Sequence, residues 1–583
     1  MKILLVGINA KYIHTNSAVR SLQQYYLTHE SIHPKAEVSI AEFTINQSRA
    51  LILREIVLTR PDAVGFSCYI WNWRLVQQLT VELRVVLPNA YIFYGGPEVS
   101  YEPEDILRET GVDGILCGEG EESFAALADC LAGRNSALKA DDETLGGIPG
   151  LARWIDGKYY AAPPVVPLSL DQLPLPYTDA DCPAERIIYY ESSRGCPFAC
   201  QYCLSSIEGG VRYKSSDRVY AELQFFLDHR VRQVKFVDRT FNCQDQRARE
   251  IISYLIHHDN GVTNFHFEIA GELVTDAFCQ LVGTARKGLL QFEIGVQSTY
   301  SNTLQAVQRK TDMEKLTQVV HTLKAQENVH LHLDLIAGLP HEGYSRFAQS
   351  FDDVFALRPD QLQLGFLKLL RGSGLRRDKD TYGLAASPEP PYEILQTDAL
   401  SYPEILRLKQ VENMVEIYYN SNRFRQSIAY LLTQHPSPFA MFEAMGDAYD
   451  RRGYHQKSLS KLEVFDFLYD FCLDCGGHEE LFRWCIRYDL YSHEKANKLP
   501  TWLGQGLNHL YRDRIRGFYH NSDNIQQYLP EYIGLEPKRI SRMAHIEVFP
   551  KEPTGDPSNT QAVLFNYRHI DILGNAQTQI VPI

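Results

Sequence analysis

Two successive runs of alternating strand and helix patterns constrain the fold of this 583-residue chain more than any other feature. In the first run, up to about residue 165, short apolar stretches end in Gly-rich turns and alternate with amphipathic stretches. Such alternation predicts a doubly wound α/β sheet of parallel strands, with ligands at the carboxyl ends of those strands. Strands are expected at residues 2–6, 36–43, 63–67, 91–94 and 114–117.

A Pro-rich connector at residues 166–186 predicts an irregular linker between this first domain and the next. Six further βα repeats between residues 187 and 375 predict an open, partial (β/α)6 barrel with its site at the strands' C-terminal ends. Residues 376–583 predict an accessory domain of helical and α+β character, with helices at 402–419 and 459–474 and paired strands at 546–549 and 562–569. The barrel strands are expected at 187–192, 233–237, 264–269, 290–296, 330–336 and 361–367.

The composition excludes several classes of protein. A net charge of −14 is opposite in sign to that of a chain built to coat nucleic acid. No apolar run reaches the roughly 18 residues that a membrane span requires. The twelve cysteines are irregularly spaced, which does not fit a disulfide framework. The sequence therefore predicts a cytoplasmic globular protein, with neither a membrane nor a nucleic acid as its partner.

Three clustered cysteines, Cys196, Cys200 and Cys203, carry the clearest chemical signal in the chain. Their C-x3-C-x2-C spacing supplies three thiolates on one short loop. Three thiolates can bind three irons of a [4Fe–4S] cluster and leave the fourth iron open to a small molecule. The alternative is a zinc site, which needs four ligands that are usually arranged as two separated pairs. The nearest candidate for a fourth ligand is Cys182, before the first barrel strand, so the cluster is favoured.

The cysteine spacing, just after the first strand of a βα barrel, resembles the radical S-adenosylmethionine (radical SAM) superfamily. Residues 234–242, 292–298 and 333–340 resemble the second, fourth and fifth strand motifs of that family. The resemblance implies that the open iron binds S-adenosylmethionine and that reductive cleavage yields a 5′-deoxyadenosyl radical. It places contacts to S-adenosylmethionine at Asp238, Glu268, Glu293, Gln297 and Gly338. For each glutamate, an ordinary buried and paired side chain is the alternative.

Residues 95–100 and 111–123 resemble the cobalamin-binding domain, of flavodoxin-like fold, that often precedes this barrel. The glycines would allow close approach of a bulky, flat ligand, and Ser67 would bond to its nucleotide tail. The alternative is a generic sheet of this type with empty loops. His14 lacks the Asp and Gly of the motif that supplies an axial histidine, so it is expected to be a polar loop residue. The resemblance implies cobalamin contacts at Ser67, Gly95, Gly96, Gly118, Glu119 and Gly120.

The C-terminal part resembles an uncharacterised domain that is appended to some cobalamin-type radical enzymes, with Tyr392 and Tyr418 among the points of resemblance. Cys472, Cys475 and Cys485 would suit a second cluster or a zinc ion. Their place in an apolar, helical pattern favours core packing instead.

Together these resemblances imply a cobalamin-dependent radical SAM enzyme that transfers a methyl group through methylcobalamin to an unactivated carbon. Cobalamin-dependent rearrangement or cyclisation, a radical methylthiotransferase and a non-catalytic cobalamin sensor are the alternatives. The expected partners are a small-molecule or peptide substrate and a reducing electron donor such as flavodoxin or ferredoxin.

Overall fold

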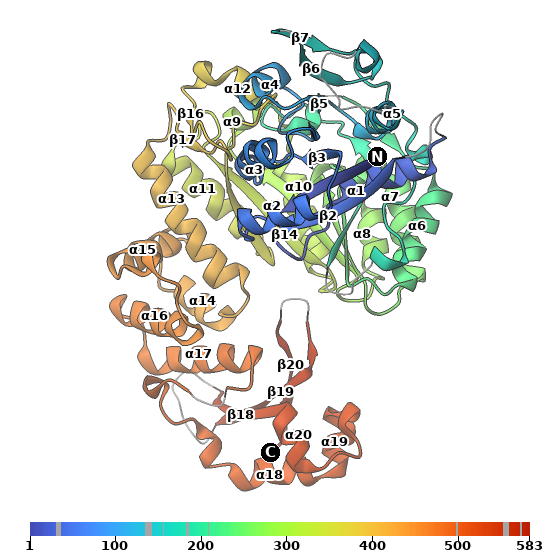
Figure 1. The fold of residues 1–583 in the computed structure, drawn as a ribbon. Coiled ribbons are helices and arrows are strands. Elements are labelled where there is room, and N and C mark those ends of the chain that lie inside the picture. Colours follow the sequence, from blue (N-terminus) through green and yellow to red (C-terminus); the bar gives the residue numbers. More distant parts are fainter. Residues whose placement is uncertain are drawn as a thin grey trace. The chain divides into compact units, whose positions relative to one another are not determined.

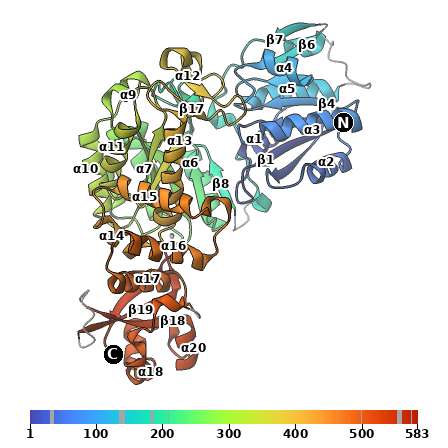
Figure 2. The ribbon, with the colours of Figure 1, turned by 90° about the vertical axis from the view of Figure 1, so that its left-hand side faces the viewer.

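The computed structural model describes residues 1–30, 36–133, 143–155, 157–181, 186–207, 209–496, 499–551, 559–571 and 574–583. The chain forms two compact units, which Figures 1 and 2 show as ribbons. The first unit comprises Met1–Leu331, Gly338–Gly343 and Phe366–Ser401. The second comprises His332–Ala337, Tyr344–Gly365 and Tyr402–Ile583.

A seven-stranded sheet forms the N-terminal part of the first unit, with strand order β2-β1-β3-β4-β5-β6-β7. The first five strands along the chain are parallel, as predicted. The last two, β6 and β7, pair antiparallel, and the sequence analysis named no strand there. The bounds are β1 Lys2–Asn9, β2 Glu37–Thr44, β3 Ala63–Ser67, β4 Tyr91–Gly95, β5 Gly114–Leu116, β6 Leu151–Ile155 and β7 Lys158–Ala161.

Helices cover both faces of this sheet, and two apolar clusters form its core (Figure 1, blue to cyan). Val19 of α1 and Phe124 of α5 belong to the cluster on one face. Ile52 of α2, Trp73 of α3 and Ile106 of α4 belong to the cluster on the other. The predicted doubly wound arrangement is therefore confirmed. The helices are α1 Ser17–Thr28, α2 Arg49–Leu58, α3 Trp73–Val86, α4 Pro103–Thr110 and α5 Gly120–Ala132.

The second βα series begins at β8 (Ile187–Tyr190) and continues with β11 (Gln233–Phe236), β12 (Asn264–Ile269) and β13 (Leu290–Gln297). These four strands pair in parallel in that order. The β14 (His330–Ala337) and β15 (Gln361–Phe366) strands complete the six predicted repeats along the chain. The intervening helices are α6 Ser216–Asp228, α7 Asp245–His257, α8 Asp276–Val282, α9 Ser301–Ala306, α10 Met313–Lys324 and α11 Tyr344–Phe355.

The β13 strand shows which face of this sheet is polar. Phe292, Ile294 and Val296 are fully buried, and the Phe292 ring lies 5.7 Å from that of Phe278 on α8. The alternate residues of the strand, which include Glu293 and Gln297, are partly exposed on the opposite face. This alternation, expected of a strand between helices and a cavity, places Glu293 and Gln297 on the face away from the helices.

The second unit combines a helical region with a small sheet (Figure 2, orange to red). The β18, β19 and β20 strands form an antiparallel sheet in that order, and the predicted pair is joined by a third strand. Apolar residues of α17 pack on one face, and those of α18, α19 and α20 on the other. No helix in the described part of the chain is long and apolar enough to cross a membrane. Bounds are α13 Tyr402–Met414, α14 Arg425–Leu432, α15 Pro438–Arg451, α16 Lys461–Asp474, α17 Glu479–His493, α18 Arg512–His520, α19 Ser522–Tyr528, α20 Pro537–Met543, β18 Ala544–Pro550, β19 Thr560–Ile570 and β20 Ala576–Val581.

Candidate functional site

The three cysteines lie on a loop, residues 196–203, that we call the cluster loop. It begins directly after β9 (Ser193–Gly195) and forms part of the connection to β10 (Val211–Tyr213), which pairs antiparallel with β9. Gly195 has a φ of +104°, and a Cβ at this position would lie 2.2 Å from the carbonyl oxygen of Gly210, so only glycine fits this close crossing. Cys196 and Cys200 are buried, and Cys203 is partly exposed.

The arrangement of the cysteines distinguishes between the two metal sites considered for them. Tetrahedral zinc with bonds of about 2.3 Å brings its sulfur ligands to within about 4 Å of one another. Among the described residues, no group of three ligand atoms within 4.8 Å of one another includes these cysteines. As placed, the three side chains therefore do not form a three-ligand site for a single ion, and the C-x3-C-x2-C spacing remains the argument for a cluster. Cys182, the candidate fourth zinc ligand, lies outside the described residues.

Asp238 holds the start of the cluster loop. Its carboxylate, 1% exposed, accepts hydrogen bonds from the backbone N–H of Ser192 at 2.8 Å and from the hydroxyls of Ser192 and Ser193, both at 2.6 Å. Burial raises the pKa of Asp238, and these hydrogen bonds oppose the rise. The carboxylate expected to contact S-adenosylmethionine is thus already engaged with the residues that lead into Cys196. Its contact with the cofactor stays a prediction.

Arg309 lies against the cluster loop, and the sequence analysis missed it. Its Nη1 is 3.9 Å from Cys200 Sγ and 3.4 Å from the Tyr202 hydroxyl, while Nη2 donates to the Gly295 carbonyl. Its Nε is buried without a hydrogen-bond partner in the described structure. Burial raises the pKa of the Cys200 thiol, and Arg309 opposes that rise. No motif marks an isolated arginine after a short helix, so only the structure places it here.

The polar face of the barrel carries the predicted contacts to S-adenosylmethionine. Glu293 pairs with Lys235 and with His266, each at 3.0 Å. Glu268 is opposite Glu293 in the register of β12 and β13, so the two carboxylates are neighbours on this face. Glu293 is therefore a paired glutamate, the alternative weighed for it. Binding of ribose hydroxyls by Glu268 and Glu293 stays a prediction.

Gln297 and Gly338 both adopt left-handed backbone conformations. Gln297 has a φ of +72°, which is uncommon outside glycine, and its Oε1 is buried with no partner among the described residues. Gly338 has a φ of +87°, and a Cβ there would lie 2.6 Å from the Ile394 side chain. A strained glutamine with an unused acceptor suits a ligand contact, whereas Gly338 is explained by packing.

The predicted cobalamin residues at the ends of β3 and β4 are closely packed. The Ser67 hydroxyl accepts from the Asn16 side chain at 2.9 Å. Gly96 has a φ of +110°, and a Cβ there would lie 2.6 Å from the Cys68 carbonyl oxygen. A Cβ on Gly95 would only touch the Leu116 carbonyl, at 3.7 Å. Of the two glycines, Gly96 is required by the approach of the backbone itself.

The second glycine turn, after β5, has space beside it and is tied to the barrel. Gly118 has a φ of +80°, and a Cβ there would meet no atom within 4 Å, whereas one on Gly120 would meet Leu22 at 3.1 Å. Glu119 pairs with Arg212 and, at 2.9 Å, with Arg194. The Glu119 carboxylate thus joins the N-terminal sheet to the β9–β10 hairpin, and a cobalamin contact by it stays a prediction.

Arg194 completes this junction. It also pairs with Glu121 at 3.0 Å and with Glu191 at 2.7 Å. Arg194 stands two residues before Cys196, and Glu121 stands in the first turn of α5, beside Gly120. The turn predicted for cobalamin and the loop predicted for the cluster are therefore joined directly within the first unit.

Two further features lie at the carboxyl edge of the N-terminal sheet. His14 Nδ1 lies 2.6 Å from the hydroxyl of Tyr189 on β8, a contact in keeping with the polar loop role predicted for it. Tyr69 and Trp71, after β3, stack with ring centroids 4.3 Å apart and planes 8° from parallel. Trp71 is 44% exposed, and its indole N–H donates to the Ile8 carbonyl at 3.0 Å. Sequence reasoning missed this flat, accessible surface because nothing distinguishes two loop aromatics from core residues.

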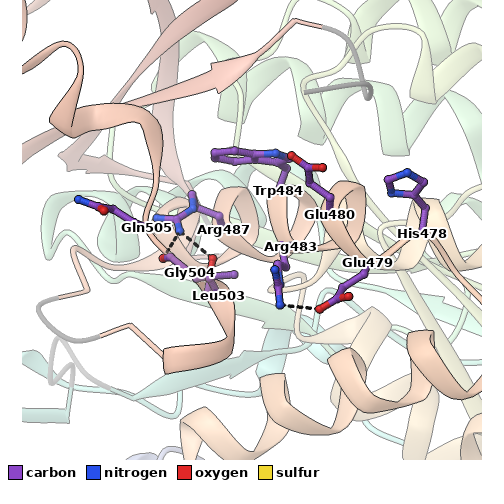
Figure 3. A pocket seen from close by; sticks show the side chains of 9 residues that line it. All are labelled: His478, Glu479, Glu480, Arg483, Trp484, Arg487, Leu503, Gly504 and Gln505. Carbon is purple, nitrogen blue, oxygen red and sulfur yellow. Dashed lines mark hydrogen bonds and ion pairs between the residues drawn. The ribbon is translucent and has the colours of Figure 1, made fainter. Parts of the chain in front are cut away.

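A cavity of about 620 Å³ lies in the second unit, at the N-terminal half of α17 (Figure 3). Arg483 pairs with Glu479 at one side, and Arg487 donates to the carbonyls of Leu503 and Gly504 at the other. None of the residues predicted to bind a cofactor lines it. Its lining comprises His478, Glu479, Glu480, Arg483, Trp484, Arg487, Leu503, Gly504 and Gln505.

Three family sequence models match successive parts of the chain. The model described as "B12 binding domain" matches residues 3–128, and that described as "Radical SAM superfamily" matches residues 190–354. A third, described as "Protein of unknown function (DUF4080)", matches residues 380–565. The first two place cobalamin in the N-terminal domain and a [4Fe–4S] cluster with S-adenosylmethionine in the central domain.

Two curated relatives and one solved structure are similar to this chain. The cobalamin-dependent radical SAM methyltransferase TokK of Streptomyces tokunonensis is 24% identical over 58% of this chain and 51% of its own. The 2-(S-pantetheinyl)-carbapenam-3-carboxylate methyltransferase of Streptantibioticus cattleyicolor is 25% identical over 66% and 61%. This chain thus spans less than two thirds of either relative.

The solved structure is that of the cobalamin-dependent S-adenosylmethionine radical enzyme OxsB, with aqua-cobalamin and S-adenosylmethionine bound. It covers 92% of this chain and 81% of its own, with a TM-score of 0.54 and 14% identity, so the likeness concerns the fold.

The residues of the first unit fit the cofactors that these domains imply. The three cysteines share one short loop, Gly118 borders open space, and Gln297 offers an unused acceptor on the barrel's polar face. These features and the family matches lead to one conclusion: the chain combines an N-terminal B12-binding domain, a central radical SAM domain and a C-terminal domain of unknown function.

Proposed function

We propose that this chain is a cobalamin-dependent radical SAM enzyme that transfers a methyl group to an unactivated carbon of a small molecule. The observation that carries the proposal is the junction at Arg194, which binds Glu119 and Glu121 beside one predicted cofactor loop and stands two residues before Cys196 in the other. Two cofactors that act on one substrate must be held at a fixed separation. The Arg194 junction provides such a fixed link between the two cofactor loops. The printed names of the two curated relatives, both methyltransferases, support the same reaction.

We assign the cofactor contacts as follows. Cys196, Cys200 and Cys203 bind the cluster. The polar face of the barrel binds S-adenosylmethionine, through Glu268, Glu293, Gln297 and Gly338, with Asp238 as the further contact. The turns after β3, β4 and β5 bind cobalamin, through Ser67, Gly95, Gly96, Gly118, Glu119 and Gly120. The proposed domains are residues 1–165, a linker at 166–186, 187–375 and 376–583.

The protein's own residues position these groups. When bound, the cluster supplies the electron for cleavage of S-adenosylmethionine, and cobalamin carries the methyl group that the substrate receives. Asp238 fixes the entry to the cluster loop through three hydrogen bonds. Arg309 directs a guanidinium N–H toward Cys200, where positive charge favours the thiolate form. The proposed partners are an external electron donor such as flavodoxin or ferredoxin and a small-molecule or peptide substrate.

Anaerobic reconstitution followed by spectroscopy and product analysis tests the proposal. The expected result is four irons per chain, bound cobalamin and formation of 5′-deoxyadenosine from S-adenosylmethionine under reduction. Cys200→Ala should abolish this cleavage and retain cobalamin binding. Cys475→Ala, which removes an exposed cysteine of the second unit, is the matched control and should behave as the parent protein. Cleavage retained in Cys200→Ala would overturn the cluster assignment.

The same experiment separates the alternatives. Eight irons per chain without cobalamin would favour a radical methylthiotransferase. Bound cobalamin without any cleavage of S-adenosylmethionine would favour a cobalamin sensor. Cleavage with both cofactors bound, but with a product that gains no methyl group, would favour rearrangement or cyclisation.

A further inference from the structure

Residues 366–401, which we call the clasp, contact the loops proposed for all three cofactors. The clasp contains α12 (Gly374–Arg377) and a small hairpin of β16 (Ala385–Ala386) and β17 (Ile394–Gln396). It follows β15 in the chain but belongs to the first unit, together with the N-terminal sheet and the cluster loop. More than half of it lies within the match to the domain of unknown function, residues 380–565.

The clasp binds the loop at residues 95–100, which we call the cobalamin loop. Arg371 Nε donates to Glu98 at 3.2 Å, and its Nη1 donates to Glu102 at 2.6 Å. Arg376 reinforces the contact from the next turn, with its Nε 3.0 Å from Glu102. A Cβ on Gly372 would lie 2.4 Å from the Tyr101 ring, so the Tyr101 side chain packs against the clasp as closely as glycine permits.

Glu98 is the centre of this contact. Its side chain is 1% exposed, and it also accepts a hydrogen bond from the hydroxyl of Tyr392, which is 2% exposed. Burial raises the pKa of Glu98, and Tyr392 and Arg371 oppose that rise. A buried carboxylate depends on such partners, because an uncompensated charge in the interior is strongly unfavourable. The position of the cobalamin loop is therefore fixed by residues nearly 300 positions away in the chain.

The clasp also contacts the cluster loop and the strand end proposed for S-adenosylmethionine. The backbone N–H of Leu375 donates to the carbonyl of Gln201, between Cys200 and Cys203, at 2.9 Å. A Cβ on Gly374 would lie 1.9 Å from the Gln201 side chain. Ile394 packs against Gly338 closely enough to exclude any side chain at that position. One short segment thus touches the cobalamin loop, the cluster loop and Gly338.

We propose that the clasp holds the three cofactor loops at a fixed separation and that Arg371 is the positioning residue for the cobalamin loop. The inference rests on the proposed function for the identity of the ligands, but the contacts themselves do not depend on it. Transfer between two cofactors is sensitive to position, and a misplacement of about 1 Å can cost about a hundredfold in rate. Arg371 suits this role because its planar guanidinium bonds to two carboxylates of the same loop region at once.

Hydrogen exchange of the full chain, without added cofactors, tests the clasp directly. The Cys68 and Glu98 amides bond to the carbonyls of Gly95 and Cys68 and report on the cobalamin loop. In Arg371→Gln, their exchange should be at least tenfold faster than in the parent protein. The matched control is Arg377→Gln, which also alters an arginine of the clasp but removes a side chain that is 75% exposed. Unchanged exchange in Arg371→Gln would overturn the proposal, even if the proposed reaction were correct.

A titration of the reconstituted protein with hydroxocobalamin is the second measurement. Arg371→Gln should bind cobalamin at least tenfold more weakly than Arg377→Gln and still hold four irons per chain. Equal affinity in the two variants would contradict the positioning role. If the parent protein did not bind cobalamin, the proposed function would be contradicted. The hydrogen-exchange measurement would then still test the clasp.

A double variant separates positioning from a general loss of folding. Glu98→Gln removes the buried charge that Arg371→Gln leaves unpaired, so the double variant should recover part of the exchange protection at Cys68. Tyr392→Phe removes one hydrogen bond to Glu98 while it keeps the ring, and its exchange rates should fall between those of the parent and Arg371→Gln. If the two substitutions accelerated exchange independently, so that their effects simply added in the double variant, direct coupling between Arg371 and Glu98 would be refuted.

Discussion

Asp238 shows how one buried side chain organises the cluster loop. Its two carboxylate oxygens accept three hydrogen bonds from the consecutive residues Ser192 and Ser193, immediately ahead of Gly195 and Cys196. Hydrogen bonds to a charged acceptor contribute more than neutral ones, at about 1.5–3 kcal/mol each. The entry to the cluster loop is therefore more firmly held than a surface turn would be.

We expect Asp238→Asn to weaken this entry, because an amide has one acceptor oxygen and presents its NH2 group to serine donors. The free energy of unfolding should fall by about 1–3 kcal/mol, and the iron content after reconstitution should fall with it. Urea unfolding of the full chain and iron analysis check both. Asp380→Asn, at an exposed position, is the control and should leave both unchanged. Full iron content in Asp238→Asn would show that the cluster loop does not depend on this carboxylate.

The residue types at the site could be predicted from the sequence, but their partners could not. The C-x3-C-x2-C spacing predicts Cys196, Cys200 and Cys203 as cluster ligands because it brings three thiols together on one short loop, and this assignment stays a prediction. The partners of Asp238 lie 45 and 46 residues away, and Arg309 lies 109 residues from Cys200. Contacts between such distant segments depend on how the elements pack, and no local pattern encodes them. Asp238, which the sequence predicts to contact S-adenosylmethionine, is therefore found in the structure to hold the entry to the cluster loop.

The strands of both series were predicted within a few residues, because burial on both faces leaves continuous apolar runs at β1, β3 and β4. The prediction lacked β6, β7 and β20, as well as the short strands β9, β10, β16 and β17. Of the four residues of β7 none is buried, and only the two end residues of β20 are. A strand at the edge of a sheet buries little apolar surface, so it carries neither an apolar run nor a clear period of two.

The α14 helix begins on a carboxylate supplied by α17. Asp489, 2% exposed, accepts from the backbone N–H groups of Gln426 at 2.9 Å and Ser427 at 2.8 Å. Burial raises the pKa of Asp489 to about 7, and these hydrogen bonds only partly oppose it. Since this pKa lies above the unfolded value of about 3.9, the stabilisation is fully present below pH 4 and is lost as the pH rises toward 7.

We therefore expect the free energy of unfolding to vary less with pH in Asp489→Asn than in the parent protein. Relative to this variant, the parent protein should lose up to about 1.4 kcal/mol per pH unit between pH 5 and pH 7. Unfolding of the full chain at a series of pH values measures the difference. The control is Asp474→Asn, whose side chain is 59% exposed, and its difference from the parent should not vary over this range. A constant difference for Asp489→Asn would contradict the raised pKa.

The first unit as a whole is held by ion pairs between its N-terminal sheet and its barrel. Arg194 bonds to Glu119 and Glu121 on one side and to Glu191 on the other. Burial disfavours the ionised form of Glu121, but Arg194 outweighs it, so the pKa of Glu121 is lowered. A lowered pKa stabilises the fold above the unfolded value, about 4.3, and this contribution is lost as the pH falls through the folded pKa.

Arg194→Met should lower the free energy of unfolding by about 3–5 kcal/mol at pH 7, because it leaves the buried carboxylate of Glu121 without its ion-pair partner. The difference in the free energy of unfolding between parent and variant should become smaller as the pH falls below about 4, where Glu121 becomes protonated in both. Urea unfolding at pH 7 and at acidic pH checks the sign. Arg108→Met, which breaks an exposed pair with Glu104 on α4, should cost about 1 kcal/mol or less. A gap that widens in acid would refute the role of Glu121.

The hydrogen bond from Tyr392 to Glu98 spans 294 positions of the chain, and this has a consequence for synthesis on the ribosome. At about 5–20 residues per second, the cobalamin loop emerges about 15–60 s before the tyrosine that secures it. During that interval the nascent N-terminal sheet can fold while its ligand face is still unsecured. We expect cobalamin to bind most rapidly at this stage. Cobalamin added only after translation ends should bind more slowly, because Tyr392 then already holds the loop.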